Sequence, residues 1–370
     1  MVRKLIPQIP MKRISGKFCL LASSLILLPL LVSQTAHATP HFAVYANTSC
    51  SHCHVNPTGG GMRSSHGVNL YSEFSLKKSS PLFPPEFKGR VGQYFGIGGD
   101  VRLQNLSTIE SPTNNSFTIL WGSLYLAADP HKHLTIYTDT DLANTTSREA
   151  YGMVHHLPGN SWFKFGRLNQ PYGLRVPDPT SFIRSDLGFT FANQDLGVEI
   201  GAEPGPLTLA LALTNGVGGG AGDDNQAKAI TWFSEWRKSI LRFGGSVHFN
   251  DAQTTRLLTG GAHSGLHLGK VALLGEVDRA EVRNKTNDTD RTITLGYGEI
   301  NYAPIQGLYC RGIYDVEDDN LAPSGLHHRI GGGVEFFPIP FMEVNLLYRM
   351  QIGNGTLGDD QIVGQLHGFF

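Results

Sequence analysis

An excess of charge of either sign is missing from this chain of 370 residues. Its 30 lysines and arginines are matched by 31 aspartates and glutamates, which gives a formal net charge of -1, and only 16% of the residues are charged. Proteins that bind the phosphate backbone of nucleic acid carry a positive excess that displaces counterions. We therefore expect no nucleic-acid partner.

Cysteine is also scarce, with only four in the chain. Cys19 falls in an N-terminal apolar run and Cys310 stands alone. A disulfide framework, which many secreted proteins use, is therefore excluded. Cys50 and Cys53, which are close together, need a different explanation.

The chain has one long hydrophobic run, residues 18–32. Basic residues precede it and Ala36-His37-Ala38 follows, which fits the small-x-small pattern of a signal peptidase site. We interpret residues 1–38 as a removed secretory signal peptide. A retained anchor is the alternative, but the run is short for a spanning helix. No later segment is a candidate for one.

Residues 50–54 read Cys-Ser-His-Cys-His, the C-x-x-C-H pattern of covalent haem c attachment. Two thiols at this spacing add to the porphyrin vinyl groups, and the next histidine ligates the iron. The motif predicts one haem c, bound through Cys50 and Cys53 with His54 as axial ligand. The alternatives are a zinc site that also uses His66, and a simple disulfide.

The sixth iron ligand is left open by the sequence. Met62 and His66 follow the motif and are the leading candidates, with His41 or an open site as further alternatives. A methionine would raise the reduction potential relative to a histidine. The glycines at 59–61 predict a tight turn that lets the backbone pass close to the porphyrin.

From about Tyr94 onward the chain divides into segments of alternating apolar and polar residues, the period of strands with two different faces. The count is about sixteen strands. We predict an all-β fold, a transmembrane outer-membrane β-barrel of about 16 antiparallel strands over residues 91–370, preceded by a short monohaem cytochrome c segment, residues 39–90. The clearest alternation lies at 207–214, 241–250, 329–336 and 342–351.

A soluble sandwich shows the same alternation, so three further features favour the barrel. Long polar links alternate with tight ones, the last segment ends in an aromatic residue on the face of Ile362 and Leu366, and aromatic residues near strand ends suit interfacial girdles. The expected long links are 107–116, 142–148, 171–194, 214–227, 283–290, 318–326 and 352–360, the link near Asp251 is a short exception, and the girdle residues are Trp121, Trp232, Trp236, Tyr302 and Tyr348.

The longest link, 171–194, either folds inward as a constriction or lies outside on the rim. Inward-facing polar residues are what any water-filled lumen shows, so none is assigned a specific role. No Ser-His-Asp order, phosphate loop or paired-carboxylate motif stands out. The expected lumen residues are His248, Glu276, Asp278, Arg311 and Asp315.

A haem c segment directly before a barrel of this size resembles the fused monohaem cytochrome c-porin proteins of the outer membrane of Gram-negative bacteria, best known through iron-oxidising members. The resemblance rests on Cys50, Cys53, His54 and the barrel pattern. The stretch "VNPTGGGMRSSHG" differs from the loop typical of that family. The resemblance implies a haem at the periplasmic mouth or within the lumen, exchanging electrons between an extracellular redox partner and a periplasmic c-type cytochrome.

Three functions are compatible with these features. The first is an electron carrier, with iron as a candidate extracellular partner and metal oxidoreductase activity as a consequence. The second is a diffusion porin in which the haem segment is a plug or docking module. The third is a haem-based sensor with an open iron site.

Overall fold

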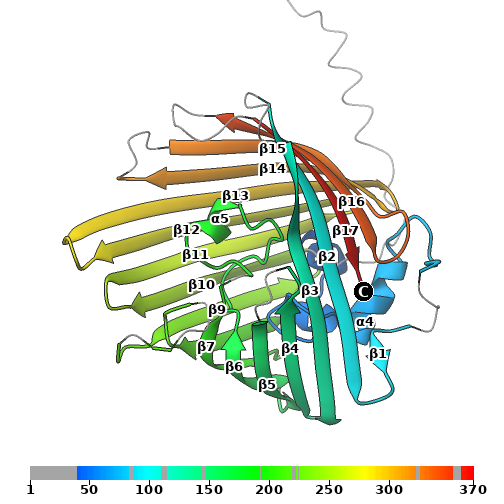
Figure 1. Ribbon diagram of the computed structural model, residues 1–370, viewed down its shortest axis with the longest axis horizontal. Helices are drawn as coiled ribbons and strands as arrows, with labels where there is room; N and C mark the ends of the chain where they lie inside the picture. The colour runs from blue at the N-terminus through cyan, green and yellow to red at the C-terminus, as the bar shows by residue number, and fades with distance from the viewer. Residues whose placement is uncertain are drawn as a thin grey trace, which may run out of the picture. The chain divides into compact units, whose positions relative to one another are not determined.

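The computed structural model describes residues 40–82, 87–109, 115–143, 147–191, 193–218, 222–223, 225–321, 326–352 and 360–370 (Figure 1). The predicted signal peptide, including Cys19, lies outside the described residues.

Sixteen strands, β2 to β17, form one antiparallel sheet, and the short β1 pairs with β2. Successive strands pair with each other, and β17 pairs with β2, so the sheet closes into a barrel. The predicted all-β antiparallel barrel and its number of strands are confirmed; the cytochrome c character of residues 39–90 stays a prediction. The strands are β1 (Arg90–Val91), β2 (Phe95–Thr108), β3 (Asn115–His131), β4 (Leu134–Asp141), β5 (Ser147–Leu157), β6 (Ser161–Leu168), β7 (Asp195–Ala202), β8 (Leu207–Thr214), β9 (Ala229–Lys238), β10 (Leu241–Asp251), β11 (Thr255–Leu268), β12 (Val271–Asn284), β13 (Thr289–Ile305), β14 (Leu308–Asp319), β15 (Leu326–Phe336), β16 (Met342–Ile352) and β17 (Gln361–Phe369).

The outer face of the sheet is apolar and the inner face is polar, which is the reverse of a soluble protein. On β10, Leu241 and Phe243 point outward and are 48% and 57% exposed. His248 points to the opposite face and is 3% exposed. The same arrangement holds on β8, where the leucines face outward and the threonines and alanines inward. A soluble sandwich buries its apolar face, so this distribution belongs to a barrel surrounded by lipid. No helix in the described part of the chain is long and apolar enough to span a membrane.

The alternation of long and short connections is confirmed at most positions. Strands β3 and β4, β5 and β6, and β11 and β12 are joined by tight turns at one end of the barrel, and long links lie at the other. The predicted long link 283–290 is wrong, because Asn284 pairs with Thr289 and only residues 285–288 lie outside the strands. Short turns are periplasmic in outer-membrane barrels. We call this end the short-turn end.

Trp121 was predicted in an outer girdle and instead faces the lumen. A bulge lets Arg102 pair with Trp121 while the next residue, Leu103, pairs with Ile119, so that Leu120 is the extra residue. An extra residue in one strand changes the face of the sheet to which the side chains beyond it point. Of the other four predicted girdle residues, Trp232, Tyr302 and Tyr348 are exposed on the outer face, and Trp236 is half-buried.

The last strand, β17, closes the barrel as predicted. Ile362 and Leu366 are exposed on its outer face. Phe370 follows the end of the strand, and its ring lies 5.9 Å from that of Phe87. Phe370 extends the pairing of β17 with β2, because its amide donates to the Gly99 carbonyl at 3.0 Å and its carbonyl accepts from the Gly99 amide at 3.3 Å.

Residues 40–82, which we call the plug, carry the helices α2 (Pro40–Ala46), α3 (Cys50–Cys53) and α4 (Ser65–Ser72). Helix α2 packs against β11 and β12. Its His41 lies 3.2 Å from Glu299 and 3.4 Å from Glu335, two inward-facing carboxylates of β13 and β15. Elsewhere in the plug, the Met62 amide donates to Tyr137 of β4 at 3.1 Å. The first part of the plug therefore lies inside the barrel and contacts several of its walls.

Residues 169–194, which we call the inner loop, join β6 to β7 and carry α5 (Phe182–Ser185). Helix α5 packs against β12, β13 and β14, which lie across the barrel from β6 (Figure 1). Arg184 pairs with Glu276 at 2.7 Å, and Tyr172 donates to Asp278 at 2.8 Å. Of the two alternatives for this link, the inward fold is the one observed.

Candidate functional site

Helix α3 is a single turn that places the two cysteines on one side of the plug. Ser49 precedes it in extended conformation, and the His54 amide closes the turn by donating to the Cys50 carbonyl at 2.9 Å. Cys50 and Cys53 are not joined by a disulfide. The simple-disulfide alternative therefore has no support from the geometry, and two thiols stand one turn apart beside His54.

The glycine-rich segment folds back on the cysteine turn. His54 bridges Arg63, and the Val55 amide donates to the Met62 carbonyl at 3.0 Å. Between them, residues 59–61 all have positive φ, a conformation that favours glycine. A Cβ on Gly60 would lie 2.6 Å from the Phe191 ring, and one on Gly61 would lie 2.4 Å from the Tyr137 hydroxyl. The glycines are therefore required for approach to the inner loop and the barrel wall.

Helix α4 supports the cysteine turn from the other side. The Ser64 amide donates to the Cys53 carbonyl at 2.9 Å, and the Ser64 hydroxyl donates to the His52 carbonyl at 2.8 Å. A Cβ on Gly67 would lie 2.2 Å from the Cys53 carbonyl oxygen. The two helices therefore meet at backbone distance, which only glycine permits at this position.

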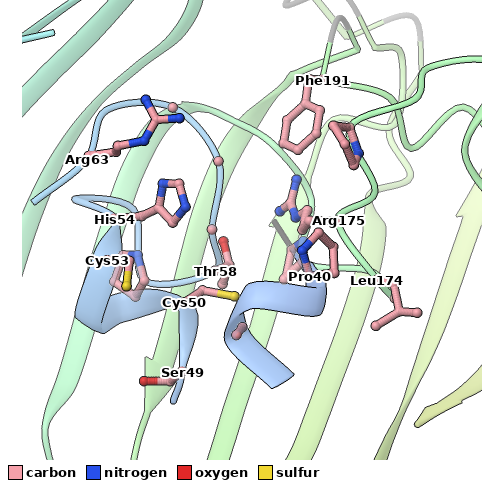
Figure 2. A pocket seen from close by; sticks show the side chains of 18 of the residues that line it. Pro40, Ser49, Cys50, Cys53, His54, Thr58, Arg63, Leu174, Arg175 and Phe191 are labelled. Atoms are coloured by element: carbon pink, nitrogen blue, oxygen red, sulfur yellow. The ribbon is translucent and has the colours of Figure 1, made fainter. Parts of the chain in front are cut away.

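The cysteine turn opens onto a cavity in the lumen, which we call the lumen cavity (Figure 2). Cys50, Cys53 and His54 line it from the plug, Trp121 from β3, and Phe191 from the inner loop. The space between the lining atoms is about 1470 Å³, part of it open to solvent.

The His54 side chain is buried, neutral and not fully hydrogen-bonded, as a metal-ligating histidine requires. Its Nδ1 atom is buried and has no hydrogen-bond partner. Burial, and secondarily the Arg63 guanidinium, lower the pKa of His54 to about 4. The imidazole is therefore neutral near pH 7, which is the form that ligates metals.

Both thiols are held in the protonated form. Burial raises the pKa of Cys50, and burial together with the neighbouring Cys50 raises the pKa of Cys53 to about 11. Thiols of this kind are unreactive towards oxidants and alkylating agents compared with an exposed cysteine.

The candidates for a sixth ligand do not line the lumen cavity. Met62 is 2% exposed and packs against β2, where a Cβ on Gly96 would lie 2.4 Å from its methyl carbon. His66 is exposed on α4, and His41 lies between two carboxylates. Two barrel histidines, His263 and His367, do line the cavity. The identity of the sixth ligand stays a prediction.

No three His, Cys, Asp or Glu side chains among the described residues converge in a way that could hold a bare metal ion. The zinc alternative, which needs His66 beside the cysteines, therefore gains no support. The predicted lumen residues face inward. Glu276, Asp278 and Asp315 bind the inner loop, whereas the hydrogen-bond and ion-pair partners of His248 and Arg311 belong to the barrel wall. Their partners are Thr231 for His248, Arg184 for Glu276, Tyr172 for Asp278, Glu299 and Glu335 for Arg311, and Ser181 and Arg329 for Asp315.

The sequence did not predict several of the cavity residues as part of the site. They come from segments far apart in the chain: Arg63, Trp121, Arg175, Phe191, His263 and His367. The length of the link at 171–194 was the one available signal, since it indicated a segment able to reach the lumen. It did not identify which of its side chains would face the cysteines.

A second opening lies at the short-turn end of the barrel and also borders the cysteine turn. His52 and His54 line its inner part, and Arg90, Lys132 and His156 line its outer part. Its one lining carboxylate, Asp129, is paired with Arg90. The opening is therefore bordered by basic and imidazole groups.

No family model matches the chain, and no curated protein matches its sequence. Its structure resembles outer-membrane porins and channels. The loop-deleted OmpT of Vibrio cholerae aligns with a TM-score of 0.60 at 12% identity, over 75% of this chain and 99% of that chain. The anion-selective porin of Comamonas acidovorans gives 0.56 at 11%, over 75% and 99%. The channel DcaP of Acinetobacter baumannii gives 0.57 at 10%, over 75% and 97%.

At sequence identities of 10–12%, the similarity to these porins and channels concerns the fold alone. It shows that the sheet is a porin-like barrel, and this fold supports an outer-membrane location. The resemblance to cytochrome c-porin fusions rests on Cys50, Cys53, His54 and the barrel pattern, and none of these comparisons tests it.

Proposed function

We propose that the protein is an outer-membrane electron-transfer protein that carries one haem c, bound through Cys50 and Cys53 with His54 as axial ligand. The observation that supports it most is the position of these three residues, which lie inside the barrel and line one lumen cavity. The bound haem would supply a one-electron redox couple.

The residues present fit a covalently attached haem. The thiols are free, the His54 imidazole is neutral with an unpartnered nitrogen, and apolar groups of Leu120, Trp121 and Phe191 line the cavity beside them. The inner loop and the barrel wall line this space and separate part of it from bulk water. A low-dielectric, rigid surrounding of this kind limits the reorganisation that accompanies a change of charge.

The barrel opens at two ends, and we assign one redox partner to each. The membrane band is about 25 Å tall, so a single haem needs a partner on each side. We propose a periplasmic c-type cytochrome at the second opening, where His52 and His54 are reached past Lys132. An extracellular donor or acceptor, with iron as a candidate, meets the opposite end.

A diffusion porin is the second candidate, and the likeness to solved porins favours it. In that case the plug would narrow a conducting channel, and the haem would be a docking or structural element. Ion conductance that survives the loss of haem would support this function.

Visible spectroscopy of the purified full-length mature protein tests the first proposal. We expect the absorption bands of reduced haem c, a single one-electron reduction step, and one haem per polypeptide. The bands should be lost in Cys50→Ala/Cys53→Ala, while Cys310→Ala, which alters a cysteine outside the motif, should retain them. A colourless wild-type protein from a host that attaches haem c would contradict the proposal.

A further inference from the structure

The lumen cavity carries an excess of positive charge. Counting the histidines as neutral, five arginines and three carboxylates among the described residues line it, an excess of two positive charges. Holding unbalanced charge away from bulk water is unfavourable, so a cavity of this kind favours an anionic occupant. The charged groups are Arg63, Arg102, Arg175, Arg237, Arg242, Asp100, Glu235 and Glu343.

Most of the charged groups in the cavity have partners there. Glu235 lies 2.9 Å from Arg237 and 3.5 Å from Arg242. His367 lies 2.8 Å from Asp100 and 2.7 Å from Glu343, and the Arg102 guanidinium adjoins this group. The three carboxylates are therefore already engaged by other side chains of the cavity.

Arg175 differs from these arginines because it forms no ion pair with any described residue. Its Nη2 donates to the carbonyls of Asn169 and Gln170, at 3.5 and 3.0 Å. Its guanidinium lies 5.7 Å from the centre of the Phe191 ring. Figure 2 shows the side chain projecting from the inner loop into the space that Cys50 and His54 also line.

Glu149 and Glu199 attract the Arg175 guanidinium, but neither forms an ion pair with it. Glu149 accepts hydrogen bonds from Asn56 at 3.2 Å and from the Asn169 amide at 2.9 Å. Glu199 pairs with Lys164 at 2.9 Å. A guanidinium binds a carboxylate through two parallel hydrogen bonds, and Arg175 has donors left to form them.

We propose that Arg175 binds a carboxylate of the cofactor, one of the two propionates of the haem. This inference rests on the proposed function. The thioether bonds would attach the porphyrin to the plug, and the Arg175 contact would attach it to the inner loop. Arg175 is thus a positioning residue that links the conformation of the inner loop to the presence of the cofactor.

Reversible porphyrin binding to the full mature chain tests this inference. Cys50→Ala/Cys53→Ala prevents covalent attachment and retains His54. This protein is titrated with ferric protoporphyrin IX and with its dimethyl ester, in which both propionates are uncharged, and the Soret band is followed. A charge-assisted hydrogen bond corresponds to about tenfold or more in affinity, so we expect the free acid to bind about tenfold more tightly than the ester.

Adding Arg175→Gln should weaken binding of the free acid about tenfold and leave binding of the ester unchanged, and Arg175→Lys should lie between them. Arg283→Gln, which alters an exposed arginine paired with Asp288 outside the lumen cavity, is the control and should retain the preference for the free acid. Equal affinities for acid and ester would overturn the inference while the haem proposal stands. Failure of both porphyrins to bind, with a colourless wild type, would overturn both.

Discussion

The two thiols of the cysteine turn are protected by burial, which has a measurable consequence at the scale of single residues. Because burial raises the pKa of Cys53 to about 11, only about one thiol in a thousand is ionised at pH 8, compared with about a quarter for an ordinary cysteine. In haem-free Cys50→Ala/Cys310→Ala protein, we expect the rate of iodoacetamide labelling of Cys53 to rise about tenfold per pH unit from pH 8 to 10.

The same protein unfolded in urea is the control for this titration. Its labelling rate should approach a plateau near pH 9, because the unfolded thiol has its ordinary pKa of about 8.5. A plateau at that pH in the folded protein would show that the thiol is not buried as described.

Gly67 is the residue on which the packing of α3 against α4 depends. In Gly67→Ala the new methyl group would lie 2.2 Å from the Cys53 carbonyl oxygen, so the cysteine turn has to move. Overpacking of this kind costs about 1–3 kcal/mol, and we expect less haem per polypeptide in the purified variant. Gly364→Ala, where a Cβ meets nothing within 4 Å, should match the wild type. Equal haem content in both variants would refute this account of the contact.

At the scale of elements, the inner loop is held in the lumen by buried ion pairs. Arg184 and Glu276, which are 2% and 1% exposed, are 2.7 Å apart. Removing one partner of such a pair costs about 3–5 kcal/mol, because the other charge is left buried. We therefore expect Arg184→Gln to loosen the inner loop, measured as faster proteolysis at residues 169–191 and larger current fluctuations in planar bilayers.

Arg283→Gln provides the matched comparison for the inner-loop variant. Arg283 pairs with Asp288, but both side chains are more than half exposed, and exposed pairs contribute about 0–1 kcal/mol. It should behave as the wild type in both assays. If the two variants have the same effect, the loop is held by something other than this pair.

The strands were predictable from the sequence because each must present an apolar side to lipid. On β10, for example, Phe243 and Val247 face outward and Arg242 and Ser246 inward, which is the alternation read from the sequence. Local deviations were not predictable. The bulge at Leu120 inverted the facing of Trp121, and the pairing of Asn284 with Thr289 extended two strands through polar residues expected to form a link.

For the molecule as a whole, the sequence indicated the three motif residues but not their surroundings. Cys50, Cys53 and His54 are adjacent in the chain, so a pattern reveals them. Arg175 and Phe191 reach the same cavity only because the inner loop crosses the lumen, and this depends on ion pairs with β12 that no local pattern encodes. Long-range contacts of this kind decide which of the predicted polar residues surround the motif.

The plug and the inner loop together occupy the lumen, and this arrangement separates the two candidate functions. A barrel of sixteen strands is wide enough for an aqueous channel. Deletion of the plug, residues 40–82, should therefore raise single-channel conductance in planar bilayers several-fold, because it empties the part of the lumen beside β4, β10 and β13. Cys50→Ala/Cys53→Ala, which keeps the plug but cannot attach haem, should retain the low conductance of the full chain. If the full chain already conducts as well as the deletion variant, solute passes around the plug, and the diffusion-porin function replaces electron transfer as the better account.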